Sequence, residues 1–181
     1  MSETDHGTPA ASPGSVSVAP YGVGTIRLPP GLTPGQLADR LYAMPDTVAG
    51  LPQRRVFSDA DSAVVVYAID EGVPVPRFGM AVVLVVPPAS DADAAVADLE
   101  RRRWGDPAEH DLSASGPGGD GEPAFREFSR IFPPGLFLLP YRPVFFLLWY
   151  RKDEEYAFMV IGDTPVVREG LARAMAQALQ A

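Results

Sequence analysis

The sequence predicts an α+β domain: an antiparallel sheet of about five to six strands, with three helices mainly on one face. Two observations lead to this class. The predicted elements follow the order helix, strand, strand, helix, strand, hairpin, helix, and the apolar runs are short and rich in β-branched residues. Doubly wound parallel folds alternate strands and helices one for one, which this order does not. The order is also compatible with two α–β–β units, Thr33–Val86 and Ser90–Ile161, followed by a closing helix.

Capping signals predict the three helices. Thr33 and Gln36 have the spacing of a capping box, and the helix they begin is expected to stop at Pro45. A second helix is expected from Ser90 to Gly105, and a third from Thr164 to Leu179. In each segment the apolar residues recur at helical spacing, which predicts one buried side per helix.

Five segments have the composition of strands. Two of them, Val144–Arg151 and Tyr156–Ile161, flank the charged sequence Lys152–Glu155, which only a solvent-exposed turn would accommodate. They therefore predict an antiparallel hairpin. The other three are Ala63–Ile69, Met80–Val86 and Ala124–Arg130, the last with the irregular alternation of an edge strand.

The chain length of 181 residues is typical of one domain, and a hydrophobic fraction of 46% supplies a packed core. Residues 1–22 are rich in Ser, Thr, Pro, Gly and Ala, so we expect a disordered N-terminal head before a single domain at 23–181. Glycines and acidic residues also predict a mobile loop at about 105–123.

Charge and cysteine content exclude several classes of function. The formal net charge of −8 disfavours nonspecific binding to nucleic acid. The chain has no cysteine, which excludes disulfides, thiolate nucleophiles and iron–sulfur clusters, and we expect no cofactor. Acidic residues at the start, with no apolar stretch after them, disfavour a secretory signal and predict a cytoplasmic location. Ile131–Tyr150 is apolar but contains four prolines and Arg142, so it does not predict a transmembrane segment.

Catalytic side chains are scarce. The two histidines, His6 and His110, lie in the predicted head and the predicted loop, and no nucleophile motif accompanies either. Residue spacing predicts no metal site. Asp59 and Asp61, placed on one strand face by alternation, are the one carboxylate pair retained as a candidate for calcium binding or acid–base chemistry.

The most informative feature is the aromatic density near the predicted hairpin. Strand alternation places Phe146, Leu148 and Tyr150 on one face. If the helices cover only the other face, this row is an exposed apolar strip, which is typical of a binding surface. The competing interpretation is that the proline-rich segment 133–143 folds back over it.

Two further clusters are candidate sites. The basic cluster at the end of the second predicted helix would bind an anion or an acidic partner segment, or it would only complement the helix dipole; it consists of Arg101, Arg102, Arg103 and Trp104. A small-molecule pocket between sheet and loop would be lined by Tyr67, Arg126, Tyr141 and Trp149.

These observations favour a non-catalytic interaction or assembly module that uses an apolar sheet face to bind itself or another protein. The first alternative is a small-molecule-binding domain or enzyme with a pocket between the sheet and the long loop. The second is the soluble domain of a membrane-associated protein, whose anchor would lie outside this chain.

Overall fold

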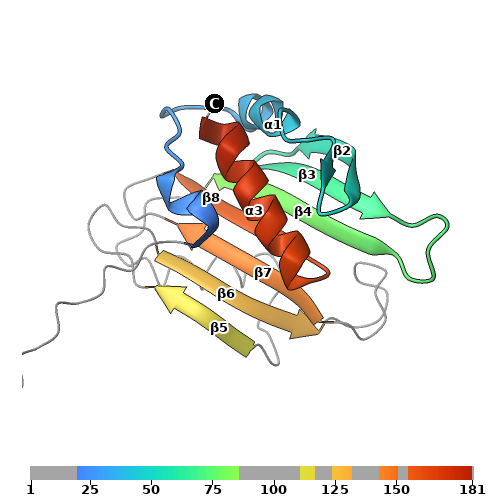
Figure 1. The fold of residues 1–181 in the computed structure, drawn as a ribbon. Helices are drawn as coiled ribbons and strands as arrows, with labels where there is room; N and C mark the ends of the chain where they lie inside the picture. Colours follow the sequence, from blue (N-terminus) through green and yellow to red (C-terminus); the bar gives the residue numbers. More distant parts are fainter. Residues whose placement is uncertain (1–19, 86–110, 117–123, 132–142, 151–154, 181) are drawn as a thin grey trace, which may run out of the picture.

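The computed structural model describes residues 20–85, 111–116, 124–131, 143–150 and 155–180. In this part of the chain, two α-helices and one 3₁₀ helix accompany a single antiparallel sheet (Figure 1). The sheet has eight strands in the order β1-β2-β3-β4-β8-β7-β6-β5. The α+β class and the antiparallel sheet are therefore confirmed.

The elements have the following bounds. The helices are η1 (Pro20–Thr25), α1 (Pro34–Tyr42) and α3 (Pro165–Gln180). The first four strands are β1 (Thr47–Val48), β2 (Leu51–Ser58), β3 (Ser62–Ile69) and β4 (Arg77–Val85). The other four are β5 (Asp111–Gly116), β6 (Ala124–Ile131), β7 (Pro143–Tyr150) and β8 (Tyr156–Gly162).

The sheet consists of two four-strand meanders that meet in the middle. Strands β1 to β4 form one half in chain order, and β5 to β8 form the other. The halves join where β4 pairs with β8, from Gly79 opposite Gly162 to Val85 opposite Tyr156. Each half therefore contains four strands, rather than the two strands of each α–β–β unit suggested by the element order.

The predicted strand count of five to six is too low, since β1, β2 and β5 were missed. Strand β2 carries Pro52, Arg54 and Arg55, which obscure its apolar pattern. Strand β5 lies inside the segment 105–123 predicted as a mobile loop. Helix η1 begins at Pro20, so the last residues of the predicted head belong to it. The helix expected from Ser90 to Gly105 lies outside the described residues. The other two predicted helices are present as α1 and α3.

Helix α1 begins with the predicted capping box. The Thr33 backbone N–H donates to Gln36 Oε1 (2.8 Å), and the Gln36 N–H donates to Thr33 Oγ1 (3.2 Å). These two bonds satisfy donors that have no partner within the helix. The helix ends at Tyr42, one turn before Pro45, with Ala43 as its C-cap.

Helix α3 lies directly against the centre of the sheet, and two glycines permit this close approach. A Cβ atom at Gly162 would lie 2.5 Å from the Arg168 backbone nitrogen, and one at Gly79 would lie 2.6 Å from Leu171 Cδ1. Gly79 and Gly162 face each other across β4 and β8. Because neither glycine has a side chain, the first turns of α3 pack directly against the backbone of β4 and β8 at this pair.

The start of α3 is fixed by two polar interactions. Thr164 Oγ1 accepts a hydrogen bond from the Val167 N–H (3.2 Å), which is the expected N-cap. The preceding residue, Asp163, is buried and accepts from Arg77 Nε (2.5 Å) and from the Phe78 N–H (3.2 Å). Together these bonds join the β8–α3 connection to the beginning of β4.

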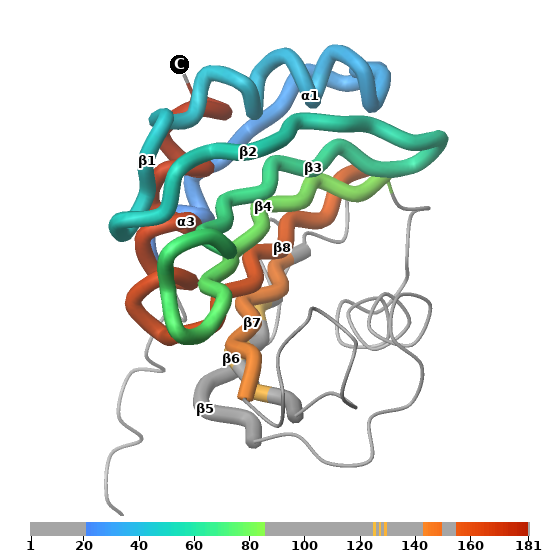
Figure 2. The backbone as a smooth tube through the Cα atoms, turned by 90° about the vertical axis from the view of Figure 1, so that its right-hand side faces the viewer, coloured from blue at the N-terminus to red at the C-terminus, as the bar shows by residue number. Residues whose placement is uncertain are grey.

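Both faces of the sheet are buried. Helices α1 and α3 lie on the same side (Figure 2), where they enclose the larger core, which includes Leu37, Tyr67, Trp149 and Leu171. A second core occupies the opposite side and includes Val82, Phe146, Leu148 and Ile161. In the described part of the chain, no helix combines the length and apolarity needed to cross a bilayer.

Candidate functional site

Two of the three residues in the predicted apolar binding strip are buried. Phe146 and Leu148 are 0% and 1% exposed. Both side chains belong to the second core, with Met159 and Ile161 of the neighbouring strand. The Tyr150 side chain lies outside the described residues. The exposed strip was expected only if the helices covered one face, and the burial of Phe146 and Leu148 does not agree with it. The competing interpretation, cover by the proline-rich segment 133–143, falls on residues outside the described part of the chain, apart from Pro143.

The predicted pocket residues that the structure describes are parts of the helix-side core. Tyr67 is fully buried and donates its hydroxyl hydrogen to Pro45 O (2.7 Å), while Trp149 packs against Phe158 with ring centroids 4.2 Å apart. Tyr141 and the Arg126 side chain lie outside the described residues. Of the four predicted pocket residues, the structure therefore describes the side chains of two, and both are packed in the helix-side core.

Neither the predicted basic cluster nor the predicted carboxylate pair is found as a site in the described part of the chain. Arg101, Arg102, Arg103 and Trp104 lie outside the described residues. Asp59 and Asp61 occupy the turn between β2 and β3 rather than one strand face. There Asp59 Oδ1 accepts from the Asp61 N–H (3.2 Å) and the Ser62 hydroxyl (2.6 Å), which makes it a turn-forming residue. Among the described residues, no group of three or more potential metal ligands occurs.

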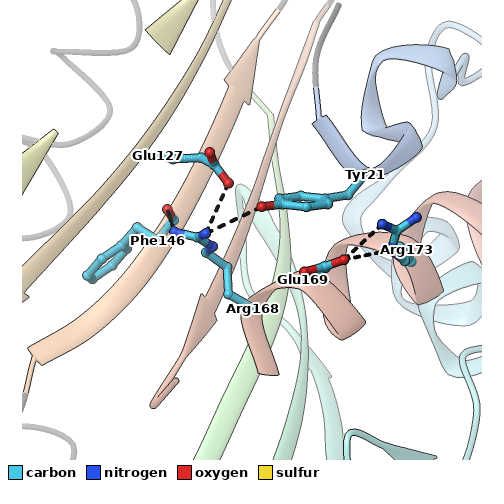
Figure 3. Close-up of polar contacts among 6 residues, drawn as sticks. All are labelled: Tyr21, Glu127, Phe146, Arg168, Glu169 and Arg173. Atoms are coloured by element: carbon cyan, nitrogen blue, oxygen red, sulfur yellow. Dashed lines mark hydrogen bonds and ion pairs between the residues drawn. The ribbon is translucent and has the colours of Figure 1, made fainter. Parts of the chain in front are cut away.

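A buried polar cluster that the sequence argument missed links three elements (Figure 3). Arg168 of α3 places Nη2 3.0 Å from Glu127 Oε1 of β6, and these side chains are only 8% and 11% exposed. Arg168 also donates to Phe146 O and to the Tyr21 hydroxyl, each at 3.5 Å. We call these residues, Tyr21, Glu127 and Arg168, the buried polar cluster.

Tyr21 occupies an unusual position in this cluster. Its backbone has φ +59° and ψ +22°, the left-handed region that non-glycine residues rarely adopt. Burial raises the pKa of the Tyr21 hydroxyl, and the hydrogen bond and negative charge of Glu127 raise it further. The guanidinium of Arg173 lies 5.5 Å from the centre of the Tyr21 ring and also pairs with Glu169 at 2.8 Å.

The buried polar cluster acts as a clamp. Its opposite charges neutralise each other in a region with little water, and the tyrosine hydroxyl attaches η1 to α3 and β6. This arrangement holds the N-terminal turn against α3 and β6, while the Arg168 Nε atom is buried without a hydrogen-bond partner of its own. The sequence gives little signal for it, because arginine and glutamate are normally exposed and Arg168 interrupts the apolar stripe of α3.

Strand β2 is paired on its outer side only at its start. Strand β1 pairs only with Leu51 and Pro52, and the Gln53 N–H donates to Asp46 O (2.7 Å). Beyond that point no described strand pairs with the outer side of β2. We call the segment Arg54–Ser58 the open edge of the sheet. The sequence did not reveal it because β2 itself was not predicted.

Comparison with known protein families, curated proteins and solved structures gives no significant match.

Proposed function

We propose that the protein is a non-catalytic assembly module that binds an extended polypeptide segment along the open edge. The observation that carries the proposal is the combination of two buried sheet faces with a strand, β2, whose outer backbone is paired only at its start. Strand addition is an established mode of protein recognition, in which main-chain hydrogen bonds supply affinity and alternate side chains supply specificity.

The phase of the hydrogen bonds shows which groups face outward. The Asp59 N–H donates to Ser62 O (2.9 Å), so these residues form a hydrogen-bonded pair. Such pairs alternate along an antiparallel ladder, so Phe57 and Arg55 also bond toward β3. The N–H and C=O groups of Val56 and Ser58 therefore point away from the sheet, where a further strand would meet them.

The side chains beside these groups suit an added strand. Val56 and Phe57 are half-buried, one packed against each core, so each leaves some apolar surface beside the edge. Arg54 reaches back to its own chain, donating from Nε to Ala68 O (2.9 Å). Arg55 lies over the Phe57 ring, 5.0 Å from its centre. Neither arginine projects as the kind of isolated charge that commonly blocks an edge.

The other charged groups support a binding role more than a catalytic one. The buried carboxylates Asp163 and Glu127 are paired with Arg77 and Arg168, where they join elements of the fold. We keep a cytoplasmic location as part of the proposal, on the sequence argument alone.

Selection of peptides on the immobilised protein tests this proposal. Random heptapeptides displayed on phage should yield strand-forming sequences that bind the wild-type protein. Binding should fall at least about tenfold, or 1.4 kcal/mol, on the Val56→Pro variant, because proline removes an outward N–H that the fold itself does not use.

Two further variants make the result interpretable. Ser58→Pro removes the next outward N–H at a more exposed position, whereas Ser58→Ala changes the side chain and keeps the backbone donor. Binding should weaken in the first and persist in the second, with unchanged circular dichroism in both. Absence of any selected peptide, or equal binding by all variants, would show that the open edge is not a binding site.

A further inference from the structure

We infer that the segment bound at the open edge is the same segment of a second copy, so that two sheets join through β2 about a two-fold axis at Val56. This inference rests on the proposed function and specifies its partner. A two-fold contact requires a surface that is complementary to itself. The open edge satisfies this requirement in its backbone, its side chains and its charges.

The backbone of the open edge is complementary to itself, because its outward N–H and C=O groups can be arranged symmetrically about Val56. Val56 has its N–H and C=O directed outward, so two copies of Val56 would form a hydrogen-bonded pair and exchange two bonds. In the antiparallel register this sets, Ser58 of each copy faces the partner's Arg54. The irregularity in β2, between Gln53 and Arg55, lies at the start of the open edge and leaves Arg55–Ser58 regular.

The side chains become complementary in this register. Arg55 of one copy lies opposite the partner's Phe57, in the closer, non-hydrogen-bonded type of pair. Within one chain the same two residues already contact each other as a cation–π pair at 5.0 Å. Pairing two copies would therefore alternate two guanidinium groups with two aromatic rings across the axis.

Charge also fits this register. Asp59 follows β2 in the turn to β3, where its carboxylate accepts from the Asp61 N–H and the Ser62 hydroxyl, so it adds a negative charge next to the open edge. The two arginines of the dyad each lie opposite an aromatic ring rather than facing each other directly. A strand slipped by one residue would lose these contacts, because every side chain would move to the other face.

The opposite edge of the sheet gives no comparable argument. Strand β5 is the last strand of the other half, but its side chains lie outside the described residues. Its register to β6 also shifts between Leu112 and Ala114. No self-complementary pairing can therefore be derived for it.

The absence of cysteine makes the register directly testable by single-cysteine crosslinking. Equal amounts of the Arg55→Cys and Phe57→Cys proteins are mixed and oxidised with copper phenanthroline. The two cysteines would face each other in the mixed dimer, while the second Arg55–Phe57 pair of that dimer is retained. A disulfide-linked dimer should form in the mixture well above the amount in either protein alone.

The matched control is a mixture of Arg55→Cys with Ser58→Cys, whose side chains lie on opposite faces and should give only background crosslinking. Light scattering after size exclusion should show a wild-type dimer and a Val56→Pro monomer. A wild-type monomer, or crosslinking equal to the control, overturns the inference. If selected peptides still bind the edge of that monomer, the proposed function stands with another protein as partner; if they do not, both fail.

Discussion

The buried pair of Arg168 and Glu127 is the position where a single side chain should matter most to stability. Replacing Arg168 by methionine leaves the Glu127 carboxylate buried without its opposite charge. Such a loss typically costs about 3–5 kcal/mol, because a charge that water no longer solvates has lost its compensation. Urea denaturation of Arg168→Met should show a reduction of this size.

A double-mutant cycle separates the clamp from ordinary packing. In Arg168→Met combined with Glu127→Leu, no buried charge remains, so the double variant should be more stable than Arg168→Met alone. Tyr21→Phe is the milder control, since it removes the contacts of the hydroxyl with Arg168 (3.5 Å) and Glu127 but keeps the ion pair. Additive losses from the two charge substitutions would contradict the description of these residues as a coupled pair.

The raised pKa of Tyr67 predicts how the free energy of unfolding changes at alkaline pH. Burial raises its pKa, and the negative charge of Asp46 adds to this, while the hydrogen bond from Gln53 lowers it. The folded protein therefore holds the phenolic proton more tightly than the unfolded chain. This difference in pKa stabilises the folded protein fully at pH values below the pKa of Tyr67 in the unfolded chain, which is about 10. The stabilisation is lost as the pH rises through the higher pKa of Tyr67 in the folded protein.

Comparison with Tyr67→Phe isolates this effect. The variant loses the hydrogen bond to Pro45 O and should be less stable by about 1 kcal/mol at neutral pH. The difference from wild type should narrow as the pH rises above about 10, because only the wild-type residue can ionise on unfolding. Denaturation curves across this range provide the measurement, and a constant difference would show that Tyr67 titrates normally in the fold.

At the level of elements, the contact between α3 and the sheet depends on Gly162. An alanine there would place its Cβ 2.5 Å from the Arg168 nitrogen, a backbone atom that can move only with the helix. Overpacking of this kind costs roughly 1–3 kcal/mol. Gly162→Ala should lower the thermal midpoint and loosen η1, because Arg168 and the attached Tyr21 must shift with α3.

Gly35 supplies the matched control for this substitution. It lies within α1, and a Cβ there would have only Thr33 Oγ1 within 4 Å, at 3.8 Å. Alanine is the better helix former by about 1 kcal/mol, so Gly35→Ala should be neutral or stabilising. Equal destabilisation by the two variants would mean that the close approach of α3 is not what requires glycine at 162.

Elements with a strong local signal were predictable from the sequence. The capping box at Thr33 and the cap at Thr164 stand where the pattern places them, and the β7–β8 hairpin is paired as expected. Strand β2 was missed because an edge strand need not be continuously apolar. Its two arginines and Pro52 resemble a loop, and only pairing with β3 over five register positions makes it a strand.

The candidate sites were harder to predict because their character depends on contacts distant in sequence. Phe146 and Leu148 were correctly placed on one strand face, but alternation cannot tell whether that face is covered. Arg168 and Glu127 become a pair only because α3 packs on β8, β4 and β7, which brings Arg168 near β6, the strand beside β7. The two residues have 40 others between them in sequence. The open edge exists because β1 pairs only with the first residues of β2. A local sequence pattern does not show which backbone groups of a strand stay unpaired.

At the scale of the whole molecule, burial of both sheet faces directs attention to the sheet edges. In the described part of the sheet, apolar side chains on both faces are packed in the two cores, and hydrogen-bonding groups without a described partner lie along the edge strands. Dimerisation through β2 would remove one of these ends from solvent. It would also make the apparent stability of the fold depend on protein concentration, since association is linked to folding by mass action.

The net charge predicts how this association responds to salt. Each copy carries a formal charge of −8, so two copies repel each other at long range, and the two arginines at each open edge do not offset this repulsion. The Debye length falls from about 30 Å at 0.01 M salt to about 8 Å at 0.15 M, which screens this long-range repulsion while backbone hydrogen bonds persist. The dimer dissociation constant from sedimentation equilibrium should therefore decrease as sodium chloride rises over this range, and Val56→Pro should remain monomeric throughout. Tighter association at low salt would instead indicate a contact held by opposite charges, which is incompatible with strand pairing about Val56 as the main source of affinity.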